Sequence, residues 1–225
     1  MKHLRKFQKH VEEIPNLPDL SKMDSRDIEK LFETELEKTK SDLALVKHIL
    51  EYSAIDLNQN KYEGNLTPLH IATREGNWGL VTLFLEMGAD MHRPETDGTT
   101  TPLDYALIFQ DSKMIRIFLN RIDDINIQDD DGYSKLHDAV QGNRYTSARL
   151  LLEYGADANI RDFIDGSTPL FIAVENGHED MLILLLENNG DPNTVNDDGV
   201  SLAECAIAND HEEFIDILIK YGYDS

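Results

Sequence analysis

The chain has 225 residues, 40% of them hydrophobic, and its 43 acidic side chains outnumber its 21 basic ones to give a net charge of −22. Such an excess of negative charge repels nucleic acid and anionic membranes, so we expect neither as a direct partner. Apolar runs fall short of a membrane span, and no apolar stretch of a secretory signal follows the basic first ten residues. The sequence therefore predicts a cytoplasmic protein, either one elongated domain or at most two compact ones.

Residues 1–24 form a segment of their own. Leu4, Phe7, Val11 and Ile14 have a rough helical spacing, and prolines at 15 and 18 then interrupt the chain. Two alternatives stay open: the segment folds over the element that follows, or it remains a tail.

The next stretch predicts two helices, over residues 27–38 and 45–52. In the first, apolar residues recur at helical spacing, and Ser25 or Asp24 is a suitable N-cap. The second reads Leu45-Val46-Lys47-His48-Ile49-Leu50-Glu51-Tyr52. Together they indicate a helical hairpin.

A four-residue word then recurs down the chain. Its copies are Thr67-Pro68-Leu69-His70, Thr101-Pro102-Leu103-Asp104, Ser134-Lys135-Leu136-His137, Thr168-Pro169-Leu170-Phe171 and a divergent Ser201-Leu202-Ala203-Glu204. The first residues are 34, 33, 34 and 33 positions apart. A fixed period of this size is typical of stacked repeats.

Each copy has the chemistry of a helical hairpin. Thr67 can cap a first helix, and Pro68 suits its first position, where a missing N–H costs nothing. Gly76 and Gly88 can end the first and second helices in a left-handed conformation. The same role is expected of Gly177 and Asn143 after first helices and of Gly155 and Asn189 after second helices. One hairpin cannot cover its own apolar face, so neighbours must stack.

With these features the chain resembles the ankyrin repeat family over Leu66–Asp90, Thr101–Asn126, Ser134–Asn159, Thr168–Asn193 and Ser201–Asp224. The resemblance implies an all-α solenoid of about six helix-turn-helix repeats with β-turn fingers between neighbours, and partners bound on a concave face. We place the repeat domain at 25–225, with repeats at 25–59, 60–93, 94–127, 128–160, 161–194 and 195–225. The terminal copies are degenerate, as expected of caps. In this family the histidine seen here at 70 and 137 is structural.

No motif for catalysis, a cofactor or a metal is apparent. Asp129-Asp130-Asp131-Gly132 faintly resembles a calcium loop, but its twelfth position is Asp138 and not a bidentate Glu. The segment ending at Gly199 places Cys205 there and fails too. We therefore predict no enzyme, cofactor or metal site.

The fingers and the exposed side of the first helices remain as candidate protein-binding positions. They are Tyr62, Glu63, Asp97, Ile108, Phe109, Asp129, Asp130, Asp131, Tyr133, Asp162, Phe163, Ile164, Asp165, Asp197 and Asp198. Exposed apolar side chains need a partner to cover them, so Ile108, Phe109, Tyr133, Phe163 and Ile164 are the expected anchors. Packing between neighbouring fingers is the alternative, above all for Tyr133.

Finger length also varies. The intervals 58–67, 92–101 and 159–168 are each one residue longer than 126–134 and 193–201. The longer tips either reach a partner or are neutral insertions, since loops tolerate added length at small cost.

The hypothesis that follows is a non-enzymatic module that binds a basic protein through an acidic concave face, and that is monomeric when free. Charge supports it, because residues 162–225 hold 15 acidic and one basic residue, although solubility alone explains acidic surfaces. The alternatives are an immunity or inhibitor protein that blocks the active site of a cationic toxin or nuclease, a secreted effector or adaptor, and an enzyme with a hidden site.

Overall fold

A computed structural model describes residues 17–38, 40–62, 65–96 and 98–224. Throughout this part of the chain the regular secondary structure is helical, and the β-structure consists of isolated bridges. The chain divides into two compact units, residues 1–99 (unit 1) and residues 100–225 (unit 2). The predicted all-α repeat architecture is confirmed.

Unit 1 contains two stacked helix pairs. A short 3-10 helix, η1 (Leu20–Lys22), leads into the first pair, α2 (Ser25–Leu36) and α3 (Leu43–Tyr52). The second pair is α4 (Pro68–Arg74) and α5 (Trp78–Glu86). The first helices contact each other, and so do the second helices, which is the stacking expected of repeats.

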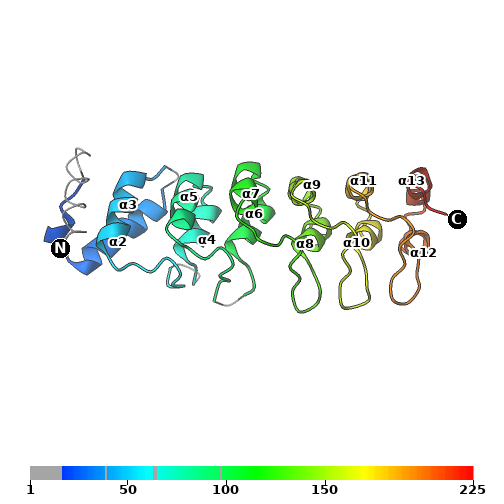
Figure 1. Cartoon of the computed structure of the whole chain (residues 1–225), viewed down its shortest axis with the longest axis horizontal. Coiled ribbons are helices and arrows are strands. Elements are labelled where there is room, and N and C mark those ends of the chain that lie inside the picture. Colours follow the sequence, from blue (N-terminus) through cyan, green and yellow to red (C-terminus); the bar gives the residue numbers. More distant parts are fainter. Residues whose placement is uncertain (1–16, 39, 63–64, 97, 225) are drawn as a thin grey trace. The chain divides into compact units, whose positions relative to one another are not determined.

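Unit 2 contains four pairs stacked in the same way. They are α6 (Pro102–Phe109) with α7 (Ser112–Leu119), α8 (Lys135–Gln141) with α9 (Tyr145–Glu153), α10 (Pro169–Glu175) with α11 (Glu179–Glu187), and α12 (Leu202–Ala208) with α13 (Phe214–Lys220). First helices contact first helices from α6 to α12. Figure 1 shows the long loops that precede α8, α10 and α12 side by side on one side of this unit.

The repeated word forms the start of each first helix, as its chemistry predicts. Thr67, Thr101, Ser134 and Ser201 each accept a hydrogen bond from the backbone N–H three residues on. The side chain at that third position in turn accepts the backbone N–H of the cap residue, through Nδ1 of His70 and His137. Both histidines are fully buried. The structural role implied by the family is therefore confirmed.

The helix ends and the buried core also agree with the predictions from the sequence. Gly76, Gly88, Gly155 and Gly177 have positive φ, as do Asn143 and Asn189. Asp24, one of the two proposed caps, begins α2 by accepting from the N–H of Asp27 at 2.8 Å. The leucine of each word is buried: Leu69, Leu103, Leu136, Leu170 and Leu202. The helical spacing predicted from Leu4 to Ile14 lies outside the described residues.

Asparagine side chains link neighbouring repeats at four points, a feature that the sequence reasoning missed. In unit 1, Asn58 Oδ1 accepts from the backbone N–H of Asp90 at 2.8 Å. The same bond recurs in unit 2, from Asp157 to Asn126, from Asp191 to Asn159 and from Asp224 to Asn193. Side-chain bonds of this kind hold the finger bases at a fixed register.

Candidate functional site

Three neighbouring finger tips of unit 2 form a continuous row, which we call the finger row and define as residues 128–134, 161–167 and 195–201. In the outer two fingers, bridges pair Gln128 with Ser134 and Val195 with Ser201. The finger row holds seven acidic residues and one basic residue. It lies directly before α8, α10 and α12, whose N-caps fix the point where each finger ends.

The middle tip differs from its neighbours in sequence and in length. Where the outer tips carry Asp130-Asp131 and Asp197-Asp198, the middle tip carries Phe163-Ile164-Asp165. The Asp162 carboxylate orders this longer turn, since one of its oxygens accepts the backbone N–H groups of residues 164, 165 and 166 at 3.0, 3.1 and 3.0 Å. Ionised carboxylates make strong bonds of this kind. The extra residue is therefore held in a defined conformation.

Backbone hydrogen bonds join the three tips. The N–H of Phe163 donates to the carbonyl of Asp131 at 2.9 Å, and the N–H of Asp197 donates to the carbonyl of Asp165 at 2.8 Å. Gly132 allows the first of these contacts, because a Cβ there would lie 2.3 Å from the Phe163 nitrogen. The tips therefore form one connected strip.

Side chains add further links along the strip. Gln128 donates to the carbonyl of Arg161 at 2.7 Å. Arg161 donates to the carbonyl of Val195 at 2.8 Å and forms an ion pair with Asp197, also at 2.8 Å. Because the finger row contains seven carboxylates and one arginine, it has a net charge of −6.

The apolar side chains of the middle tip face solvent. Phe163 and Ile164 are 67% and 65% exposed, the highest values among large hydrophobic residues in the described part of the chain. Asp129, Asp130, Asp131, Asp197 and Asp198 are exposed around them. The result is an apolar centre with a charged rim, the anatomy of a protein interface.

Two candidates are buried, and the expectation that their side chains are exposed on the fingers was wrong. Tyr62 is 7% exposed, and its ring packs against Phe32 with centroids 6.3 Å apart. Burial raises the pKa of its hydroxyl. Asp162 is 6% exposed because its carboxylate is turned inward to the amides of its own tip. Both support the fingers from within.

Tyr133 and Asp165 occupy intermediate positions. The Tyr133 ring lies 5.3 Å from that of His137, centroid to centroid, so it packs on the helix that follows its own finger. Burial raises the pKa of Tyr133, and the carboxylates of Asp162 and Asp165 raise it further. Asp165 is half-buried and accepts from the N–H of Ser167 at 3.1 Å. Glu63 and Asp97 lie outside the described residues.

A second exposed apolar pair ends α6. Ile108 is 44% and Phe109 56% exposed, and the Phe109 ring lies 6.2 Å from that of Tyr105. The next residue, Gln110, has a φ of 55° and ends the helix in the left-handed region. The structure shows both side chains at the surface of unit 2, as expected, but on a helix end and not on the finger row.

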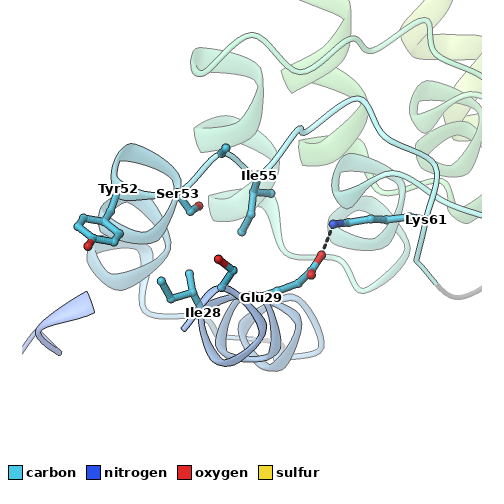
Figure 2. A pocket seen from close by; sticks show the side chains of 8 residues that line it. Ile28, Glu29, Tyr52, Ser53, Ile55 and Lys61 are labelled. Atoms are coloured by element: carbon cyan, nitrogen blue, oxygen red, sulfur yellow. Dashed lines mark hydrogen bonds and ion pairs between the residues drawn. The ribbon is translucent and has the colours of Figure 1, made fainter. Parts of the chain in front are cut away.

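Unit 1 contains a cavity of about 350 Å³ that the sequence did not indicate. Residues from α2, α3 and the loop after α3 line it, and the ion pair of Lys61 with Glu29 lies at one side (Figure 2). Its lining is completed by Ser25, Ile28, Tyr52, Ser53, Ala54 and Ile55. The lining includes the hydroxyls of Ser25 and Ser53 but neither histidine nor cysteine.

We searched the described part of the chain for metal-binding clusters and for helices that could span a membrane. No group of three or more His, Cys, Asp or Glu side chains there has the geometry to hold a metal ion. Among the helices of residues 17–224 that are described, none is long and apolar enough to cross a membrane.

We compared the sequence with protein-family models and with known proteins. The model of the family described as ankyrin repeats (3 copies) matches residues 38–129, 79–162 and 136–225. The chain is 34% identical to putative ankyrin repeat protein FPV031 of fowlpox virus (strain NVSL) over 155 residues, which are 67% of this chain and 46% of that protein.

Other relatives are longer proteins. Identity is 32% over 120 residues to the B-cell lymphoma 3 protein homolog of Mus musculus, covering 53% of this chain and 26% of the relative. It is 29% over 188 residues to neurogenic locus notch homolog protein 1 of Danio rerio, covering 77% of this chain and 8% of the relative. The chain thus spans less than half the length of each. Because the family model covers most of the sequence, the chain belongs to the ankyrin repeat family.

Proposed function

We propose that the chain is a protein–protein interaction module that recognises a basic protein through the exposed fingers and first helices of unit 2. Membership of the ankyrin repeat family supports a role in binding proteins. The acidic surface supports a positively charged partner, because opposite charges speed encounter and like charges disfavour acidic competitors.

One observation carries the proposal: large apolar side chains stand exposed on this surface among carboxylates. Ile108, Phe109, Phe163 and Ile164 are all 44% exposed or more. Burying such side chains against a partner contributes roughly 1.5–3 kcal/mol each, whereas solvated surface carboxylates contribute little affinity. The apolar groups therefore supply affinity, and the charge supplies the rate of encounter.

The test is affinity capture from a lysate of the source cell at low and at high salt. Wild type is compared with the triple variant Ile108→Glu/Phe109→Glu/Phe163→Glu. The matched control is Ile219→Glu, because Ile219 is 50% exposed but lies on a second helix, α13. Urea unfolding of each variant confirms that the surface changes leave the fold intact.

We expect a basic protein that wild type and the control retain and the triple variant loses. If the same proteins bind wild type, the triple variant and the control, and all elute at high salt, the proposal is contradicted. The negative charge would then serve only to keep the protein soluble. The stoichiometry and affinity of a retained complex separate an inhibitor from an adaptor, because an inhibitor needs nanomolar affinity, about −12 kcal/mol.

A further inference from the structure

The finger row alternates in chemical character along its length. The first tip presents Asp130 and Asp131, the middle tip presents Phe163 and Ile164, and the last presents Asp197 and Asp198. Backbone bonds between neighbouring tips fix this order in space. A chain that runs along the row therefore meets acidic, apolar and acidic surface in turn.

Hydrogen bonds hold the backbone of the apolar tip, which distinguishes it from an incidental exposed loop. Three hydrogen bonds from backbone N–H groups to the Asp162 carboxylate hold the turn. The hydrogen bond from the N–H of Phe163 to the carbonyl of Asp131 joins the first residue of the turn to the preceding finger. A preorganised contact loses little conformational freedom on binding. The conformation that exposes Phe163 and Ile164 is thus built into the finger itself.

We propose that the finger row binds an extended basic segment of the partner, with a large apolar side chain against Phe163 and Ile164 and Lys or Arg side chains toward the carboxylates on either side. The inference rests on the proposed function and specifies its partner. The strip of three joined tips matches an extended segment, and its net charge of −6 is complementary to a basic one. Asp162 is the positioning residue, since it fixes the tip without reaching the surface.

The first step of the test uses a displayed library of random 12-residue peptides, selected on the full chain and counter-selected on Phe163→Ser/Ile164→Ser. Enriched peptides are expected to carry a large apolar residue with Lys or Arg on both sides. The dominant peptide is then synthesised with a fluorophore in three forms: unchanged, with its apolar residues replaced by Ser, and with its basic residues replaced by Gln.

Binding of these forms to four variants separates the contributions. Phe163→Ser/Ile164→Ser should weaken the unchanged peptide at least about tenfold, as expected of a hot spot. Asp162→Ala should weaken it comparably, and Asp162→Asn should restore most of the affinity because its side-chain oxygen can accept the same amides. The matched surface control, Ile219→Ser, should leave it unchanged. Urea midpoints identify any loss that reflects unfolding.

Two outcomes would overturn the inference. If the peptide binds Phe163→Ser/Ile164→Ser as tightly as wild type, or its Ser form binds as tightly as the unchanged form, the apolar tip is not the contact. The proposed basic partner would still stand in that case, since the Gln form tests charge separately. If no basic peptide is enriched, the extended segment is ruled out, and capture of whole proteins decides the proposed function independently.

Discussion

Gly132→Ala offers a quantitative test of how the finger tips pack. Gly132 has a φ of 84°, a conformation that costs an L-residue about 1–2 kcal/mol. Its added Cβ would also lie 2.3 Å from the backbone nitrogen of Phe163, so the two tips must move apart. Losing the bond from Phe163 to Asp131 adds roughly 0.5–1.5 kcal/mol. We expect a total loss of about 1.5–3.5 kcal/mol in the free energy of unfolding.

The last finger provides the matched control. Gly199 occupies the equivalent turn with a φ of 77°, but an added Cβ there would meet nothing within 4 Å. Gly199→Ala should therefore cost only the conformational part, about 1–2 kcal/mol. Urea unfolding followed by far-UV circular dichroism measures both. Equal losses would refute the reasoning, because contact between tips would then contribute nothing at Gly132.

Three further predictions concern the stack. Leu136→Ala should cost about 2–5 kcal/mol in urea unfolding, because this central leucine is 1% exposed; an unchanged midpoint would contradict its assigned place in the core. Burial lowers the pKa of His137, so the folded state resists its protonation. The stability from this histidine is complete above its ordinary pKa of 6.5 and falls as the pH drops below it. His137→Asn should reduce the change in the urea midpoint between pH 7.5 and 5. If the midpoint of the variant changes with pH as much as that of wild type, other groups cause the pH dependence. Asn77→Ala should cost roughly 1–3 kcal/mol, since Asn77 caps α5 and also donates to the carbonyl of Lys38 at 3.0 Å. Asp111→Ala, which removes a cap alone, should cost about 1 kcal/mol.

Local chemistry made most of the fold predictable. A cap such as Thr67, a proline at the first helical turn and a glycine such as Gly76 at positive φ act within a few residues, so their effect can be read directly from the sequence. The repeat period then indicates which hairpins stack. The asparagine links were missed because they join residues about 32 positions apart, such as Asn159 and Asp191.

The candidate surface was harder to predict for the same reason. Finger side chains were assigned to solvent from their position in the repeat, and Phe163 and Ile164 conform to that rule. Asp162 does not, because the inserted residue creates a turn with three amides for its carboxylate to accept. Tyr62 does not, because Phe32 of the first helix pair offers it an apolar neighbour. Both depend on contacts that only the folded chain defines.

The way in which Asp162 holds the middle tip has a consequence for how such a protein can diverge. Every bond that its carboxylate makes goes to a backbone amide, so the turn does not depend on which side chains stand at 163 and 164. Substitutions there are free of the cost that accompanies changes in a packed core. Under the proposed binding mode, two codons can thus change over generations, and with them the partner that is bound, while the backbone of the turn stays the same.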